Sequence, residues 1–418
     1  MKKIGLYLWG GPGIIDLLKV KYPNPKIDIE EHWQAYDDQY LAKAKNILGV
    51  TDLWVTFSWG FSDYNERHHR QFIKDKLSSI KKHGFTVHGY VQGFNLVTND
   101  FYDQDVFCRD HHNKLMPYSR GRSFICPNNP EALKIIKERV NQACQLDFDG
   151  IYIDNIFFGL FPFFVFKNLT SFFGCSCYYC QKEFKKTYGY DLPLGMKKGQ
   201  NVIKDYLEFR SDSIYKALKI IQKTAKKHKK LFGVNLYDFK KHNSKVFFGY
   251  DIKKINHLLD YYLIENHAFK NKEQVDNSHL NEVINSCGKP VFILSYKNGI
   301  GNEPGFNQQQ LDLIYSEANN LNYCPCIKGS EYRTKGVWHL LNLNDLKQPQ
   351  KDLPYEINHK EYKSRLRTRP IIPYHLPFWN KYYTALMRFL YDNKYANELF
   401  HRSYIYTKGI RSIKNYEI

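Results

Sequence analysis

The sequence predicts an α/β protein, a (β/α)8 barrel that carries a C-terminal helical extension. Short apolar, β-branched or aromatic runs alternate along the chain with amphipathic helical stretches. Strands that are separated by helical crossovers are typical of parallel sheets with right-handed connections. Eight such units within the first ~330 residues fit the usual size of a closed barrel.

The eight predicted strands cover residues 3–10, 51–60, 85–95, 150–155, 232–238, 261–268, 290–297 and 324–332. An open, doubly wound sheet is the alternative architecture. That fold usually carries a Gly-rich phosphate loop after its first strand. The turn "WGGPG" at 9–13 lacks the G-x-G-x-x-G spacing of such a loop, so the barrel is favoured.

The helices between the strands are predicted from apolar periodicity and from residues typical of helix ends. Residues 66–84 close on a glycine and contain one apolar stripe, which consists of Phe72, Ile73, Leu77 and Ile80. Asn129 followed by Pro130 is typical of a helix start, with Asn129 as the N-cap. Further helices are predicted at 201–230 and 306–320.

The alternation of strands and helices ends near residue 335, where a Pro- and Lys-rich segment begins. We therefore predict a catalytic barrel domain over residues 1–335 and a partly helical C-terminal extension over residues 336–418. A Cys-rich insertion is predicted within the barrel at residues 156–200.

The composition is typical of a soluble globular protein, with 43% hydrophobic and 25% charged residues among 418. The first residues do not form a secretory signal pattern. The longest apolar run, residues 156–166, is too short to cross a bilayer. We therefore expect a cytoplasmic protein without a membrane span.

The net charge of +19 makes a nucleic-acid-associated protein one functional alternative. However, the lysines are scattered over predicted helix faces, and the sequence contains no basic arm, zinc-finger helix or RNP-like motif. A solvated lysine-rich surface is therefore favoured over a nucleic-acid partner. An acidic polysaccharide is also compatible with this charge.

The predicted strands end on carboxylates, amides and aromatic residues. In a (β/α)8 barrel, chemistry takes place at the C-terminal ends of the strands. This set suits a polyhydroxylated ligand, because amides can bind hydroxyl groups and aromatic faces can pack on C–H surfaces. The predicted substrate-binding residues are Trp9, Trp59, Gln92, Asn155, Asn235, Tyr237, Asn266 and Glu331.

Two strand-end carboxylates are the predicted catalytic pair. Asp154 ends "GIYID", and Glu265 follows "YYLI". A carboxylate is costly to bury at such a position unless it is hydrogen-bonded or functional. Hydrolysis of a glycosidic bond requires two flanking carboxyl groups, whose separation distinguishes retaining from inverting enzymes. Asp238 and Glu331 are the reserve candidates.

A cluster of cysteines predicts a structural metal site. Cys175, Cys177 and Cys180 form a C-x-C-x2-C motif, and one further ligand would complete a tetrahedral zinc site. Cys126 is the favoured fourth ligand and Cys108 the second choice. No open coordination position is implied, so we expect no cofactor for catalysis. The alternative is a set of free thiols.

Three segments resemble the central part of (β/α)8 glycoside hydrolases: "CPNNPEALKIIKERV" at 126–140, "FDGIYIDN" at 148–155 and "CSCYYCQKEFKKTYGYDLP" at 175–193. The Cys-rich insertion is similar to that of the family 42 β-galactosidases, in which three such cysteines and one upstream cysteine hold a structural zinc. This resemblance implies that Cys126 joins the three cysteines of the motif.

The resemblance departs from family 42 at one position. In those enzymes the motif reads Asp-Asn-Glu and the Glu is the acid/base, whereas Ile156 stands there in this sequence. The strand-end carboxylates resemble instead those of retaining α-galactosidase- and α-fucosidase-type barrels. That likeness implies Asp154 as the nucleophile and Glu265 as the acid/base.

We therefore expect a glycoside hydrolase that acts on a poly- or oligosaccharide by a two-carboxylate, retaining mechanism. The missing strand-four Glu motivates one alternative, a non-catalytic carbohydrate-binding or scaffold barrel. The basic charge motivates a second, a nucleic-acid-associated protein. The apolar segment after Asp154 is compatible with a lid or a subunit contact, and hence with a homo-oligomer.

Overall fold

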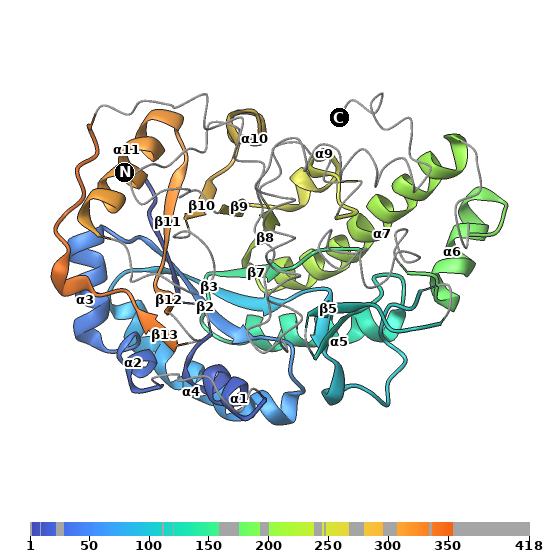
Figure 1. The fold of residues 1–418 in the computed structure, drawn as a ribbon, viewed down its shortest axis with the longest axis horizontal. Helices are drawn as coiled ribbons and strands as arrows, with labels where there is room; N and C mark the ends of the chain where they lie inside the picture. Colours follow the sequence, from blue (N-terminus) through green and yellow to red (C-terminus); the bar gives the residue numbers. More distant parts are fainter. Residues whose placement is uncertain are drawn as a thin grey trace, which may run out of the picture.

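The computed structural model describes residues 2–8, 10–21, 29–110, 113–119, 121–158, 175–192, 200–237, 245, 248–266, 280–295, 307–333 and 337–353. Eight parallel strands close into a barrel in the order β1-β11-β10-β9-β8-β7-β3-β2 (Figure 1). The predicted (β/α)8 barrel is confirmed, and the open, doubly wound alternative is wrong because the sheet closes on itself.

The barrel strands fall within, or one residue outside, the predicted ranges. They are β1 (Gly5–Leu8), β2 (Asp52–Ser58), β3 (Thr86–Gln92), β7 (Gly150–Asp154), β8 (Leu231–Tyr237), β9 (Tyr261–Asn266), β10 (Val291–Ser295) and β11 (Cys324–Lys328). Every pairing between neighbours in this barrel is parallel, as the helical crossovers predicted.

Helices connect the strands and cover the outside of the barrel. They are α1 (Pro12–Lys21), α2 (Ile29–Gln34), α3 (Asp38–Leu48), α4 (Asp63–Lys82), α5 (Pro130–Cys144), α6 (Tyr178–Tyr188), α7 (Gln200–Lys227), α9 (Ile252–Ile255), η3 (Asn256–Leu258), α10 (Asn281–Cys287) and α11 (Gln308–Leu321). Ile73, Leu77 and Ile80 of the predicted stripe are buried against the core. Asn129 caps α5 as predicted, since its side chain accepts from the backbone N of Glu131 at 2.9 Å.

The barrel interior is filled largely by aromatic rings. The buried cluster consists of Tyr7, Trp54, Tyr90, Tyr152, Tyr261, Leu263, Phe292, Leu294 and Cys326. Tyr7 meets Tyr90 and Tyr152 edge-on, with ring centroids 6.3 Å apart in each pair. Gly233 in β8 leaves room for these rings, because a Cβ there would overlap the ring of Tyr261. The interior is therefore a packed floor, and any site must lie above it.

A small antiparallel sheet interrupts the connection between β3 and α5. It consists of β4 (Asn95–Val97), β5 (Pro117–Ser119) and β6 (Arg122–Phe124) in the order β4-β6-β5, and η1 (Thr98–Asp100) follows β4. The sequence predicted a single strand over 85–95. In the structure β3 ends at Gln92 and a new strand starts at Asn95, so this excursion was missed.

The last predicted strand, 324–332, is divided in the structure. β11 ends at Lys328, and β12 (Ser330–Arg333) then pairs antiparallel with β13 (Val337–Leu340), followed by η6 (Leu343–Asp345). The hairpin lies beside α2 and α3, on the side of the barrel away from α6 and α7 (Figure 1). Glu331 is therefore on this hairpin and not at the end of a barrel strand, which corrects its predicted place.

Residues 354–418, most of the predicted helical extension, lie outside the described residues. Within the described part of the chain, no helix combines the length and the apolar composition needed to cross a membrane.

Candidate active site

Asp154 lies at the mouth of the barrel, directly above the aromatic floor. It is the last residue of β7, two residues after Tyr152, and only 5% of Asp154 is exposed to solvent. The Tyr90 hydroxyl donates to Oδ2 at 2.6 Å, and Nδ2 of Asn235 donates to Oδ1 at 2.5 Å. Both carboxylate oxygens are therefore held by groups from neighbouring strands β3 and β8.

Asn155 completes the hydrogen bonding of this carboxylate. Its backbone N donates to Oδ1 of Asp154 at 2.9 Å, and its Nδ2 donates to Oδ2 at 2.6 Å. Asn155 has a positive φ of 55°, a left-handed conformation that asparagine tolerates better than most residues. This turn brings the side chain back onto the preceding carboxylate. Tyr118 of β5 donates to Oδ1 of Asn155 at 2.8 Å and fixes the amide.

Asn235 also binds the second predicted carboxylate. Its Nδ2 donates to Oε1 of Glu265 at 2.9 Å as well as to Asp154 at 2.5 Å. The two carboxylate oxygens cannot be farther apart than the sum of these distances. This limit applies to one oxygen of each group, whereas retaining and inverting glycosidases differ in the separation of the whole carboxyl groups. Two carboxylates from β7 and β9 thus face one space.

The environment of Asp154 shifts its acidity. Burial raises the pKa of Asp154 above its usual value, because the charged form is desolvated. Hydrogen bonds from Tyr90, Asn235 and the backbone of Asn155, and the charge of Arg122, act in the opposite direction but do not cancel the effect. The charged form of Asp154 is therefore less favourable than that of an ordinary, solvated aspartate.

Gln92 and Trp59 lie next to this pair. Gln92 aligns with Asp154 in the pairing of β3 with β7, and its Oε1 is 2.8 Å from the Tyr90 hydroxyl. Its buried Nε2 has no hydrogen-bond partner among the described residues. Trp59 packs against the barrel cluster, and the guanidinium of Arg122 is 4.0 Å from its ring. Both predicted side chains therefore border the space above the floor.

The structure describes the remaining predicted residues only in part. Trp9 and the reserve residue Asp238 lie outside the described residues. For Tyr237, Asn266 and Glu331 the backbone is described and the side chains are not. Tyr237 pairs with Glu265 in the register of β8 and β9, and Asn266 is the last residue of β9, so both are at the barrel mouth.

Sequence reasoning missed three residues of the site. Tyr90 lies two residues before Gln92, and strand alternation could have placed it on the same face. Tyr118 and Arg122 come from β5 and β6, which no strand pattern had indicated. Arg122 donates from Nε to Oδ1 of Asn95 at 2.8 Å and from Nη1 to the carbonyl of Trp59 at 2.6 Å.

The four predicted cysteines come together beside the barrel. The Sγ atoms of Cys126, Cys175, Cys177 and Cys180 all lie within 4.8 Å of one another. The Sγ of Cys126 is 3.3 Å from that of Cys180 and 3.6 Å from that of Cys177. Tetrahedral zinc with Zn–S bonds of about 2.3 Å needs sulfurs roughly 3.8 Å apart, so a small expansion would admit the ion.

The cluster joins two loops of the barrel mouth. Cys126 precedes α5, whereas Cys177 caps α6 and Cys180 lies in its first turn. Cys108, the second choice for the fourth ligand, is buried nearby but does not belong to the group of four. Of the two candidates, the structure thus groups Cys126 with the motif.

No protein-family model and no curated protein sequence matches the chain. Among solved structures, it resembles a β-galactosidase from the Antarctic haloarchaeon Halorubrum lacusprofundi, with TM-score 0.54 and 12% identity over 78% of this chain. It also resembles a β-galactosidase from the psychrophilic Marinomonas ef1, with TM-score 0.51 and 11% identity over 78% of this chain. The match covers 52% and 54% of those chains, about half their length. At such low identity the likeness concerns the fold: a (β/α)8 barrel of the kind on which these β-galactosidases are built.

Proposed function

We propose that this protein is a glycoside hydrolase of the retaining, two-carboxylate type, with a poly- or oligosaccharide as its substrate. The observation that carries the proposal is the pair of carboxylates from β7 and β9, joined by one amide of Asn235. The shared donor keeps the two groups close together, as the retaining mechanism requires. The barrel likeness supports it further, because function in this fold lies at the strand ends where the pair stands.

In the proposed first step, a carboxylate oxygen of Asp154 attacks the anomeric carbon and the bond from that carbon to the leaving oxygen breaks. Glu265 donates its proton to the leaving oxygen, and a covalent glycosyl ester of Asp154 results. In the second step, Glu265 takes a proton from water, the water oxygen attacks the anomeric carbon and the ester bond to Asp154 breaks. The sugar leaves with its original anomeric configuration, and both carboxyl groups are restored.

The neighbouring residues would bind and orient the sugar. Asn155 and Asn235 hold the nucleophile in place. The Nε2 of Gln92, which has no partner among the residues that the structure describes, is a buried donor suited to a sugar hydroxyl. The aromatic side chain of Trp59 would pack on a C–H face of the ring. We extend the same role to the predicted residues whose side chains the structure does not describe, namely Trp9, Tyr237, Asn266 and Glu331.

We also propose that Cys126, Cys175, Cys177 and Cys180 hold a structural zinc ion. Four cysteine sulfurs form a closed set that leaves no position for substrate or water. The ion would tie the loop before α5 to the start of α6 and so stiffen one side of the barrel mouth. It takes no part in the proposed reaction.

The decisive experiment is turnover of aryl α- and β-glycosides by the purified protein, with Asp154→Asn and Glu265→Gln in parallel. We expect both variants to lose at least ~10³-fold in kcat/KM. Asp149→Asn, at the opposite end of the same strand, is the matched control and should stay active. A 2-deoxy-2-fluoro analogue of the accepted glycoside should label Asp154, detected by mass spectrometry of the peptide.

Full activity of Asp154→Asn would overturn the assignment of the nucleophile. A non-catalytic carbohydrate-binding barrel is the second candidate, and two observations favour it. Ile156 is fully buried where the related motif has its acid/base, and both oxygens of Asp154 already accept hydrogen bonds. That candidate predicts glycan binding without turnover, unchanged in Glu265→Gln.

A further inference from the structure

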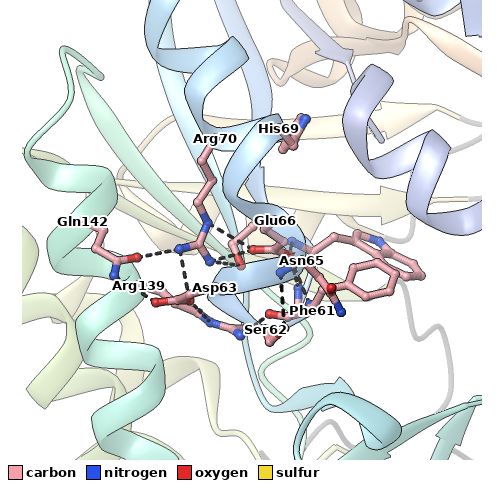
Figure 2. Close-up of polar contacts among 12 residues, drawn as sticks. Phe61, Ser62, Asp63, Asn65, Glu66, His69, Arg70, Arg139 and Gln142 are labelled. Atoms are coloured by element: carbon pink, nitrogen blue, oxygen red, sulfur yellow. Dashed lines mark hydrogen bonds and ion pairs between the residues drawn. The ribbon is translucent and has the colours of Figure 1, made fainter.

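Residues 59–61, the first three of the loop between β2 and α4, are held in an unusual way. Oε1 of Glu66 accepts hydrogen bonds from three consecutive backbone N atoms: Trp59 at 2.7 Å, Gly60 at 3.0 Å and Phe61 at 3.1 Å. Figure 2 shows Glu66 on α4, with its carboxylate turned towards the loop and towards Arg70. One carboxylate oxygen therefore accepts from all three backbone N–H groups of residues 59–61.

The three carbonyl groups of the same loop are bound as well. Nη1 of Arg122 donates to the carbonyl of Trp59 at 2.6 Å, and the backbone N of Val97 donates to that of Gly60 at 2.9 Å. Nη2 of Arg139 donates to the carbonyl of Phe61. Loops on a protein surface usually leave such groups to water. Here each backbone N–H and carbonyl group of residues 59–61 has a protein partner, so this backbone does not depend on a ligand for its hydrogen bonds.

Burial of the Glu66 carboxylate costs free energy, because the charged group loses its contact with water. Its side chain is fully buried, and its other oxygen is paired with Arg70, at 2.6 Å from Nη2 and 3.2 Å from Nε. A buried carboxylate is tolerated only when it is both hydrogen-bonded and paired. A strand-to-helix turn does not need such a charge, since a neutral side chain or water could satisfy it. The arrangement instead serves the conformation of residues 59–61.

This loop carries Trp59 to the wall of the candidate site. Gly60 has a φ of 95°, and a Cβ there would lie 2.8 Å from Nη2 of Arg122 and 3.2 Å from Cγ of Gln92. The loop therefore adjoins Gln92, whose amide contacts Tyr90, which in turn donates to Asp154. A change in the loop would move the indole of Trp59 relative to the carboxylate pair.

We infer that Glu66 is a positioning residue that fixes Trp59 as a preformed aromatic platform for one sugar ring of the substrate. The inference deepens the proposed function and rests on it. A rigid indole binds the C–H face of a sugar with little loss of conformational entropy, because its orientation is set in advance. Glu66 touches neither substrate nor reacting atoms and acts only through the loop.

The test compares Glu66→Gln with Asp63→Asn. Asp63 is one turn earlier on α4 and pairs with the same Arg70, at 3.1 Å, but makes no hydrogen bond to the loop. The glutamine would turn an amide donor towards Arg70 or towards the loop, so one contact must break. With the accepted aryl glycoside, we expect Glu66→Gln to raise KM about tenfold with kcat within about threefold, as for lost uniform binding. Asp63→Asn should leave KM unchanged.

A double-mutant cycle separates positioning from general destabilisation. If Glu66 acts through the indole, Glu66→Gln should add little to the KM of Trp59→Ala, whereas independent effects would multiply. Multiplicative effects, or an unchanged KM in Glu66→Gln, would overturn the inference.

A second readout does not depend on turnover. The fluorescence of Trp59 is the difference between the emission of the protein with and without Trp59→Phe. Acrylamide should quench this Trp59 emission more strongly in Glu66→Gln than in the wild type. Equal quenching would show that Glu66 does not hold the loop. If the wild type itself cleaves no glycoside, the proposed function fails. The quenching experiment still decides whether Glu66 holds residues 59–61 in place.

Discussion

A single amide nitrogen joins the two candidate catalytic groups: Nδ2 of Asn235 is 2.5 Å from Oδ1 of Asp154 and 2.9 Å from Oε1 of Glu265. The amide has two hydrogens, and both are used to hold carboxylates from strands on either side of β8. Its own Oδ1 has no partner among the described residues. This geometry makes Asn235 the residue on which the spacing of the pair depends.

We expect Asn235→Ala to lower kcat by about 10²-fold, the usual effect of a misplacement of about 1 Å at the reacting groups. The reason is that both carboxyl groups lose their shared donor, which no longer fixes their spacing. Steady-state kinetics with the accepted aryl glycoside would measure the change. Wild-type kcat in a folded Asn235→Ala protein would show that the bridge does not set the spacing.

Tyr90→Phe tests the pKa of the proposed nucleophile. The Tyr90 hydroxyl donates to the carboxylate of Asp154 and lowers its pKa, against the larger effect of burial. Without this bond the pKa rises further, and the nucleophile is protonated at higher pH. The acid limb of the kcat/KM profile should therefore move to higher pH. Tyr36→Phe, at another fully buried hydroxyl, is the control and should leave the profile unchanged.

Asp154→Asn should change how stability depends on pH. Because its folded-state pKa is raised, Asp154 favours the folded state below its unfolded pKa and loses this contribution as pH rises through the folded pKa. The asparagine variant has no such loss. We expect the Tm of the variant minus that of the wild type to increase between pH ~4 and pH ~8.

Asp63→Asn should change the pH dependence of Tm in the opposite direction. Burial opposes the effect, but the charge of Arg70 and the hydrogen bond from Gln142 lower the pKa of Asp63. Its contribution is present above the unfolded pKa and is lost as pH falls. The Tm difference for this variant should therefore decrease as pH rises. Two curves with the same slope would contradict the assignment of both shifts.

The cysteine cluster predicts about one zinc ion per chain, measured by elemental analysis of protein purified without added metal. Cys180→Ser should abolish the zinc and lower Tm, since metal binding contributes to folding free energy. Cys144→Ser, another buried cysteine but outside the group of four, should keep the zinc. A protein that is free of zinc and has four titratable thiols at this site would contradict the proposal.

Gly60→Ala tests how closely residues 59–61 are packed, and Gly189→Ala is its control. Gly60 and Gly189 both have positive φ, at 95° and 79°, so alanine at either pays about 1–2 kcal/mol of backbone strain. Only at Gly60 would the new Cβ also collide with Arg122, whereas nothing lies within 4 Å at Gly189. We expect a larger fall in Tm for Gly60→Ala, together with a raised KM. Equal effects in both variants would show that the loop accommodates the methyl group.

Much of the fold could be predicted because its signals are local. The strand that ends at Asp154 stands out as a short apolar run before a polar residue, and the cap Asn129 is recognisable from two adjacent residues. The C-x-C-x2-C motif indicated a metal site for the same reason. Such patterns depend on the chemistry of neighbours in the chain, which the folded structure preserves.

The candidate site could be predicted only as a set of strand ends. Strand alternation places Asp154 and Glu265 at the mouth of a barrel, but it says nothing of the amide between them. Tyr118 and Arg122 reach the site from an antiparallel excursion whose short strands carry no clear periodicity. Glu331, predicted at the end of a barrel strand, lies instead on a hairpin, because β11 ends at Lys328 and the chain then forms β12 and β13.

By itself, then, the sequence determined the eight-stranded barrel, the two carboxylates and the cysteine motif, because each follows from periodicity or spacing within a few residues. Only the tertiary structure decided that Asn235 donates to both carboxylates and that Tyr90 donates to Asp154. It also decided which four cysteines come together and that Glu66 binds the backbone of residues 59–61. These are contacts between elements, and they depend on how strands are aligned and how loops fold over the rim.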